Sequence, residues 1–195
     1  KQHLGGKKSD YDVIKIEESN GVGLEASEGN KDAWDEMIRT VSRASDDTYY
    51  YRLQGLNERG EQDSLEALLD IDGFIDYMLI NQYGGNTDWD HHNWYAIRKR
   101  GADTKGFHFL CWDTEQIFEG NHDNNLTVNN HSYPTGIFHS LLQNKKFVTR
   151  YLKRANDILA EDGILGQASV VDLWDSLYHT IEKAVYVESA RWGDY

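Results

Sequence analysis

The segment that decides the fold runs from residue 86 to residue 115 and reads NTDWDHHNWYAIRKRGADTKGFHFLCWDTE. It contains two runs with many aromatic side chains, 94–98 and 107–112, which are typical of β-strands. The residues from Gly101 to Gly106, between these runs, are typical of a turn. The segment therefore predicts a β-hairpin near the middle of the chain.

Polar residues on either side of this hairpin are expected to meet at its open end. The turn centres near Asp103, so Asn93 lies ten residues before the centre and Asp113 ten residues after it. In an antiparallel ladder, residues equidistant from the turn stand opposite each other, about 5 Å apart. Asp88 and Asp90 lie on the loop that leads into the hairpin, and both could add an oxygen ligand. We therefore expect Asp88, Asn93 and Asp113 to form one site, even if a bulge shifts the register by one or two residues.

The side chains of this site point to a particular chemistry. Carboxylate and amide oxygens gathered in one place suit a hard cation, Mg²⁺ or Mn²⁺, whose shell is completed by a phosphate ligand. A carboxylate placed slightly apart could accept a proton from a hydroxyl group. The loop and the hairpin end therefore predict a metal-dependent site that also transfers a proton.

Outside the hairpin the chain is predicted to be mostly helical, so the expected fold class is α+β. The strongest helical pattern begins at Asp63 or Ser64 and ends at Gly84-Gly85. The site loop follows it directly. The other predicted elements are a strand over 11–16, a loop or hinge over 17–29, helices over 31–44, 135–160 and 169–189, and irregular segments over 45–62 and 119–134.

Composition and charge limit the possible partners. The formal net charge is −13 at pH 7, and 39% of the residues are hydrophobic, as in a folded protein. This charge argues against nucleic acid as a partner and favours divalent cations and basic peptides or proteins. No apolar run approaches the roughly 20 residues needed to span a bilayer. The start at Lys1, without Met or a signal segment, predicts that the sequence was cut from a longer protein.

Three parts of the chain together resemble the CotH family, the spore-coat protein H type of atypical kinase. The resemblance extends from about Tyr11 to Tyr195, and it is the combination of motifs that makes it specific. The motifs are Gly85-Asn86-Thr87-Asp88-Trp89 with Asn93-Trp94-Tyr95, then Phe109-Leu110-Cys111-Trp112-Asp113-Thr114-Glu115, and finally Glu188-Ser189-Ala190-Arg191-Trp192-Gly193-Asp194.

This resemblance implies a protein-kinase-like C-terminal lobe over residues 30–195, preceded by the remnant of an N-terminal lobe and hinge over residues 1–29. It also implies transfer of the γ-phosphate of ATP, with Mg²⁺ or Mn²⁺, to Ser residues of coat or surface proteins. The expected location is the bacterial spore coat or cell surface. By the same resemblance, Asp88 is the catalytic base and Asn93 and Asp113 hold the metal, with Glu115 as a further ligand.

Two departures from ordinary kinases limit this expectation. The Asp-Phe-Gly signature is replaced by Trp112-Asp113-Thr114-Glu115. The Gly-rich loop and phosphate-binding Lys expected upstream are not visible, since Gly5-Gly6-Lys7-Lys8 lacks a flanking strand. The nucleotide-binding residues are therefore left unassigned, and the chain is expected to need a further nucleotide-clamping lobe for activity.

Other interpretations of the same residues stay open. Asp88 and Asn93 could serve only as an Asx-turn and cap. His91 and His92 could bind zinc, although adjacent histidines are expected to point in different directions and no third ligand has zinc-like spacing.

Two other functions are also compatible with the sequence. One is a non-catalytic surface or coat protein that keeps the kinase-like scaffold for binding. The other is a glycoside hydrolase that uses two carboxylates from the set Asp88, Asp90, Asp113 and Glu115. An acid/base pair has no need of Asn93, whereas a metal site does, and this favours the kinase.

Overall fold

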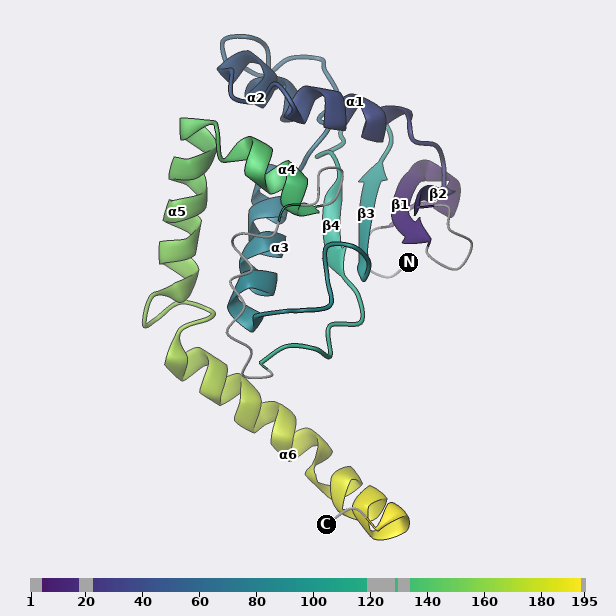
Figure 1. Cartoon of the computed structure of the whole chain (residues 1–195), viewed down its shortest axis with the longest axis vertical. Helices are drawn as coiled ribbons and strands as arrows, with labels where there is room; N and C mark the ends of the chain where they lie inside the picture. Colours follow the sequence, from purple (N-terminus) through teal and green to yellow (C-terminus); the bar gives the residue numbers. More distant parts are fainter. Residues whose placement is uncertain (1–4, 18–22, 119–128, 130–133, 194–195) are drawn as a thin grey trace. The chain divides into compact units, whose positions relative to one another are not determined.

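The computed structural model describes residues 5–17, 23–118, 129 and 134–193. The chain divides into two compact units, Lys1–Tyr151 and Leu152–Tyr195. The first unit contains the sheet and all of the candidate site residues (Figure 1). Most of the predicted loop over 119–134 lies outside the described residues.

A four-stranded antiparallel sheet in the order β2-β1-β3-β4 forms the centre of the first unit (Figure 1). The predicted strand and the predicted hairpin are both present, and the α+β class is confirmed. The expected loop over 17–29 is wrong in its second half, where residues of alternating polarity pair with β1. The strands are β1 (Tyr11–Glu17), β2 (Gly23–Glu28), β3 (Trp94–Lys99) and β4 (His108–Cys111).

The register of the hairpin differs by one residue from the prediction. Trp94 pairs with Cys111, so Asn93 faces Trp112, whose backbone N–H donates to the Asn93 carbonyl at 3.0 Å. The centre of symmetry therefore lies between Ala102 and Asp103, slightly earlier than expected. Asn93 and Asp113 are still neighbours, as a shift of one residue allows.

Of the helices, α3 runs alongside β4, at the edge of the sheet opposite β2 (Figure 1). The predicted helix over 31–44 is confirmed, but it is shorter than expected. The segment 45–62, predicted as irregular, contains a helix. Asp46 caps the start of this helix, because its side chain accepts from the Thr48 backbone N–H at 2.8 Å. The helices of the first unit are α1 (Asp32–Val41), α2 (Asp47–Leu53), α3 (Ile71–Gly84) and α4 (Pro134–Leu141), with a short 3-10 helix, η1 (Lys8–Asp10).

The helix that precedes the site begins later than the apolar pattern predicts. Residues before Asp70 are extended: Leu68 and Leu69 donate to the Leu53 carbonyl, and the Phe107 backbone N–H donates to Leu68. Asp70 then caps α3 by accepting from the Gly73 backbone N–H at 3.1 Å. These long-range backbone bonds use groups that a helix would need for its own hydrogen bonds. For this reason α3 does not start at Asp63, although the apolar pattern of a helix begins there.

A cluster of aromatic rings lies between the sheet and the helices. Trp34 of α1 stacks on Trp94 of β3 with ring centroids 5.8 Å apart, and Phe109 of β4 contacts Phe74 of α3 at 5.1 Å. Trp94 begins β3 directly after the site loop, and it is almost fully buried. Packing of this ring therefore fixes the downstream end of the loop.

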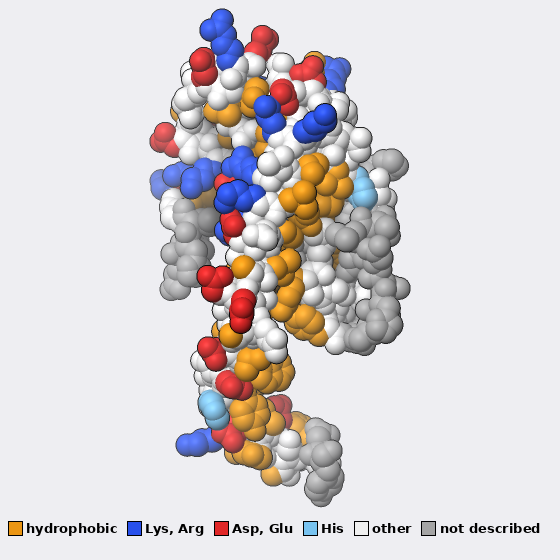
Figure 2. Space-filling model, turned by 90° about the vertical axis from the view of Figure 1, so that its left-hand side faces the viewer, with side chains coloured by type: hydrophobic (Ala, Val, Ile, Leu, Met, Phe, Trp, Pro, Cys, Tyr) orange, Lys and Arg blue, Asp and Glu red, His pale blue; other side chains and the backbone are white. Residues whose placement is uncertain are grey.

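The predicted helix over 135–160 is two helices, α4 and α5 (Lys145–Leu159). Asn144 separates them, because its Oδ1 accepts from the backbone N–H groups of Lys146 and Phe147 at 2.9 and 3.2 Å. In the second unit, α6 (Gln167–Trp192) is longer at both ends than the predicted helix over 169–189, and Gly193 caps its C-terminal end. Figure 2 shows hydrophobic side chains along this helix, and the exposed ones include Leu173, Trp174, Leu177, Ile181 and Val187.

Candidate active site

The site loop begins where α3 ends. Gly85 caps α3 with a φ of 58°, a left-handed conformation that a residue without Cβ adopts easily. The buried Asn86 then fixes the turn: its Nδ2 donates to Asn81 Oδ1 at 2.8 Å, and its Oδ1 accepts from the Asp88 backbone N–H at 3.0 Å. An Asx-turn is therefore present, but Asn86 forms it, which leaves the Asp88 carboxylate available for other contacts.

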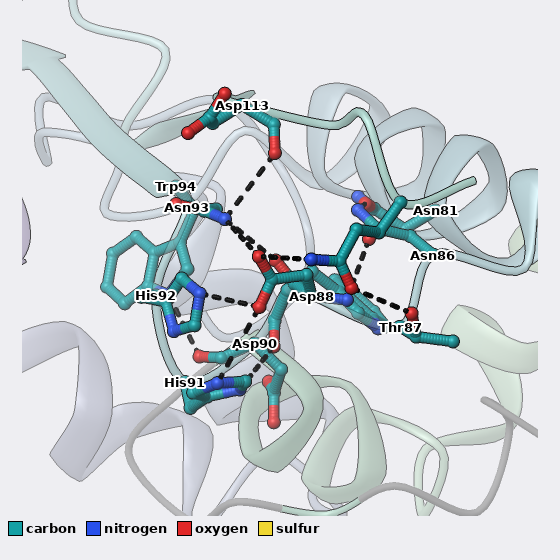
Figure 3. Close-up of polar contacts among 12 residues, drawn as sticks. Asn81, Asn86, Thr87, Asp88, Asp90, His91, His92, Asn93, Trp94 and Asp113 are labelled. Atoms are coloured by element: carbon teal, nitrogen blue, oxygen red, sulfur yellow. Dashed lines mark hydrogen bonds and ion pairs between the residues drawn. The ribbon is translucent and has the colours of Figure 1, made fainter.

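The two carboxylate oxygens of Asp88 face different groups (Figure 3). Oδ2 accepts from Asn93 Nδ2 at 3.1 Å and from Gln116 Nε2 at 3.5 Å. Oδ1 lies 2.7 Å from His92 Nε2 and 4.0 Å from His91 Nε2. The side chain is 23% exposed, so Asp88 is held in one orientation and is still accessible from solvent.

Asn93 connects the loop to the segment after β4. Its Nδ2 faces three acceptors, namely the carbonyl of Asp88 at 3.0 Å, the carboxylate of Asp88, and the carbonyl of Asp113 at 3.4 Å. The amide nitrogen therefore points into the site. The amide oxygen of the same side chain is the atom that a hard cation would use.

The structure places the backbone of Asp113 in the site but not its carboxylate. Figure 3 shows the Asp113 carbonyl directed at Asn93, while the carboxylate points away from Asp88. Asp113 and Glu115 are both exposed. The expected meeting of Asn93 and Asp113 is thus seen at the level of the backbone, whereas the Asp113 carboxylate lies outside this contact.

Asp90 has a structural position. It is 1% exposed, and its two carboxylate oxygens accept from the backbone N–H and the hydroxyl of Thr135 at 2.9 and 2.8 Å. Its carbonyl also accepts from Trp94 Nε1 at 2.9 Å. Because both oxygens are engaged in the interior, Asp90 is unsuited to be one of the two acids of a glycoside hydrolase.

The backbone of the site has an unusual conformation. Within the described residues, the non-glycine residues with positive φ are Asp90 (70°), Asn93 (60°), Asp113 (51°) and Phe118 (57°). Asn and Asp tolerate this region better than other residues, yet each such residue still costs on the order of 1 kcal/mol. All four lie in or next to the predicted site, and strain of this kind is concentrated at functional sites.

Two features of this site are not evident from the sequence. Gln116 holds Asp88 from the far side of the hairpin, and its carbonyl also accepts from the Thr87 backbone N–H at 3.2 Å. No spacing rule indicates such a contact. The expectation that His91 and His92 point in different directions is wrong, because both ring Nε2 atoms face Asp88 (Figure 3).

Two ionisable groups near the site loop, Tyr77 and Cys111, have raised pKa values. Tyr77 of α3 lies 5.9 Å from Trp89, ring centroid to centroid, and burial raises the pKa of its hydroxyl well above the usual value, as do the nearby Cys111 and Asp90. Burial also raises the pKa of the Cys111 thiol, and a hydrogen bond from Asn81 partly offsets this. Neither group is therefore an acid or a nucleophile near neutral pH.

Fold and site together define an α+β protein in which an Asp/Asn loop joins a capped helix to a β-hairpin, with an acidic segment following the hairpin. Comparison with known families identifies the particular group. The chain belongs to the family described as CotH kinase protein, whose model matches residues 1–195. Membership of this family implies an atypical kinase, that is, a phosphotransferase.

Two further comparisons gave no match, neither with a curated protein nor with a solved structure. The kinase-like C-terminal lobe therefore stays a prediction at the level of the fold. Across the described residues, no helix has both the length and the apolar character to cross a membrane.

Proposed function

We propose that this protein transfers the γ-phosphate of ATP to serine hydroxyl groups of a protein substrate, with Asp88 as the base. One observation carries the proposal: the carboxylate of Asp88 is partly exposed and is held by the amide of Asn93, five residues further along the same loop. A proton acceptor must be accessible and fixed in orientation to receive a hydroxyl proton. Asp88 meets both requirements.

Asn93, Asp113 and Glu115 would hold the divalent metal. Their oxygen atoms are of the kind that Mg²⁺ and Mn²⁺ prefer, and Asn93 and Asp113 are in contact through the Asp113 carbonyl. The Asp113 carboxylate is exposed, so its side chain is free to rotate toward the Asn93 amide oxygen. When bound, the metal would neutralise negative charge on the transferring phosphoryl group.

The same acidic character suggests the substrate. A protein with net charge −13 attracts basic segments, so we propose Ser-rich, basic stretches of coat or surface proteins as acceptors. The spore coat or the cell surface is the proposed location. The division of the chain into an N-terminal remnant (1–29) and a C-terminal lobe (30–195) is also a proposal; residues 11–17 and 23–28 share one sheet with the hairpin.

A binding and transfer experiment tests this function. The protein is incubated with ATP, Mg²⁺ or Mn²⁺ and a Ser-rich basic peptide, and both the thermal shift and the transferred phosphate are measured. We expect a nucleotide-dependent rise in Tm that is lost in Asp113→Ala, together with phosphate transfer that is lost in Asp88→Ala. Absence of both the nucleotide-dependent shift and the phosphate transfer would contradict the proposal.

One observation favours a second function. The Asp113 carboxylate points away from Asn93 and Asp88 in the structure (Figure 3), as it would in a kinase-like protein that binds partners without catalysis. This alternative predicts tight binding of a coat or surface protein and no nucleotide-dependent change in Tm.

A further inference from the structure

Three side chains of the site loop place metal-binding atoms close together on the face of Asp88 opposite Asn93. They are Asp88, His91 and His92, and one ligand atom from each lies within 4.8 Å of the other two. His92 Nε2 is 2.7 Å from Asp88 Oδ1, and His91 Nε2 is 4.0 Å from the same oxygen. The two imidazole rings are packed edge to face, with centroids 3.9 Å apart.

The hydrogen bond of His91 sets its tautomer. His91 Nδ1 lies 2.8 Å from the carbonyl oxygen of Trp89. Because a carbonyl only accepts, Nδ1 must carry the proton, and the neutral ring therefore presents the lone pair of Nε2 toward Asp88. Trp89 is buried, so this carbonyl is a fixed support. A backbone carbonyl that orients a histidine in this way is a regular feature of protein metal sites.

Hydrogen bonds also hold the Asp88 carboxylate in an orientation suited to metal binding. Its Oδ2 accepts from the amides of Asn93 and Gln116, which leaves Oδ1 on the side of the two imidazoles (Figure 3). A carboxylate whose second oxygen is held by hydrogen bonds is the usual form of a carboxylate ligand. The loop therefore supplies one oriented oxygen and two imidazole nitrogens. His92 Nε2 lies 2.7 Å from Asp88 Oδ1 and carries the proton between them, so a bound cation takes the place of this proton, which is released from the imidazole nitrogen.

We propose that Asp88, His91 and His92 form a binding site for a divalent cation that prefers nitrogen ligands, with Zn²⁺ as the representative ion. Ligand atoms about 2.0–2.1 Å from a tetrahedral zinc lie roughly 3.3 Å from one another. The two distances to Asp88 Oδ1, 2.7 and 4.0 Å, lie on either side of this value, and the His91 side chain is 49% exposed, so it is free to make the small movement required.

This site differs in chemistry from the proposed Mg²⁺ site. Asn93, Asp113 and Glu115 offer only oxygen atoms, whereas the Asp88 site has two nitrogen ligands, which Mg²⁺ binds poorly and Zn²⁺ binds well. Resting on the proposed function, the site has a regulatory consequence. A cation on Asp88 Oδ1 occupies the oxygen that would accept the substrate proton, so Zn²⁺ inhibits phosphate transfer.

Zinc binding is measured first, without nucleotide, by competition with a chromophoric chelator at neutral pH. The wild-type chain is compared with His91→Gln and His92→Gln. His108→Gln is the matched control, because His108 also contacts a carboxylate, Asp70, at 3.1 Å but belongs to no three-ligand cluster among the described residues. We expect His91→Gln and His92→Gln to weaken Zn²⁺ binding at least about tenfold, and His108→Gln to leave it unchanged. Equal affinity in the wild type and in His91→Gln would overturn the site.

Inhibition is measured second, by adding Zn²⁺ to the phosphate-transfer reaction in excess Mg²⁺. Each protein is compared with its own rate without Zn²⁺. We expect half-inhibition at the Zn²⁺ concentration that half-fills the site, and at a concentration at least tenfold higher in His92→Gln. Binding without inhibition would overturn the regulatory role, whereas absence of any phosphate transfer would contradict the kinase and leave the binding result standing.

Discussion

The side-chain amide of Asn93 donates to Asp88 twice, to the backbone carbonyl at 3.0 Å and to carboxylate Oδ2 at 3.1 Å. These two bonds close the loop between the residues. One nitrogen thus fixes both the main chain and the side chain of the proposed base, so the geometry of Asp88 depends directly on the identity of residue 93.

Replacing Asn93 with Asp tests this dependence. The variant has nearly the same size and tolerates the φ of 60°, but it cannot donate, and it places a second carboxylate beside Asp88. We expect the free energy of unfolding to fall by about 1–3 kcal/mol, measured by urea denaturation, and phosphate transfer to fall with it. Asn93→Gly is the control for the backbone, since it accepts the positive φ and loses only the side-chain contacts. If Asn93→Asp has the same free energy of unfolding as the wild type, these bonds do not have the proposed role.

The proposed division of roles between Asp88 and Asp113 predicts different kinetic effects. Asp88→Asn keeps the shape of the side chain but removes the base, so we expect transfer to fall by about 10²–10⁴-fold while metal–nucleotide affinity stays unchanged. Asp113→Asn weakens a metal ligand, so affinity for metal and nucleotide should fall. Single-turnover rates and nucleotide titrations separate the two effects. Equal loss of affinity in both variants would rule out the assignment.

The hairpin and the loop before it were predictable because local signals agree there. Aromatic runs flank a glycine-bounded turn, and Gly84-Gly85 ends a helix. The register follows from simple symmetry to within one residue. The backbone proximity of Asn93 and Asp113 therefore follows from the amino-acid sequence alone.

Other features depend on contacts that no local pattern contains. The start of α3 is determined by backbone bonds from Leu53 and Phe107, far away in the sequence. His91 and His92 converge on Asp88 because the backbone at Asp90, directly before them, is left-handed. A prediction that treats the loop as a strand or a helix does not include a residue in this conformation. The direction of the Asp113 carboxylate likewise depends on its own positive φ.

Asp90 predicts a stability effect separate from catalysis. Asp90→Ala removes the two hydrogen bonds that Thr135 donates to the Asp90 carboxylate and places Ala at a φ of 70°. We expect a loss of about 2–4 kcal/mol in the free energy of unfolding, from the lost charged hydrogen bonds and the backbone strain. Asp90→Asn is the control, because it keeps one acceptor and tolerates the backbone. Chemical denaturation measures both, and a loss of less than about 0.5 kcal/mol in Asp90→Ala would show that the anchor is unimportant.

A second His–Asp pair, His108 and Asp70, lies at the start of α3, at the end of that helix remote from the site loop. His108 Nδ1 is 3.1 Å from Asp70 Oδ2. The hydrogen bond with Asp70 raises the pKa of His108 above its usual value, although burial opposes this. Burial acts to raise the pKa of Asp70, but hydrogen bonds from His108 and from the Gly73 backbone lower it overall.

These two shifts predict how stability varies with pH. Because the pKa of His108 is raised in the folded protein, its contribution to the free energy of unfolding is fully present below the unfolded-state pKa of about 6.5. This contribution is lost as the pH rises through the folded-state pKa. The lowered pKa of Asp70 means that its contribution is present above the unfolded value of 3.8 and is lost as the pH falls through the folded value. His108→Gln should therefore reduce the free energy of unfolding more at about pH 5.5 than at about pH 8.5. The difference should be about 0.5 kcal/mol, because the His108 side chain is 45% exposed and solvent screens the pair.

The double variant of His108 and Asp70 shows whether this pH dependence comes from the pair itself. Asp70→Asn keeps a capping side chain for α3 but removes the charge, so it should abolish the pH-dependent part of the His108→Gln effect. Urea denaturation of both single variants and the double variant at the two pH values measures this coupling. A pH-independent effect of His108→Gln would show that the pair contributes through packing alone, because a protonated imidazole beside a carboxylate cannot stabilise the fold equally on both sides of its own titration.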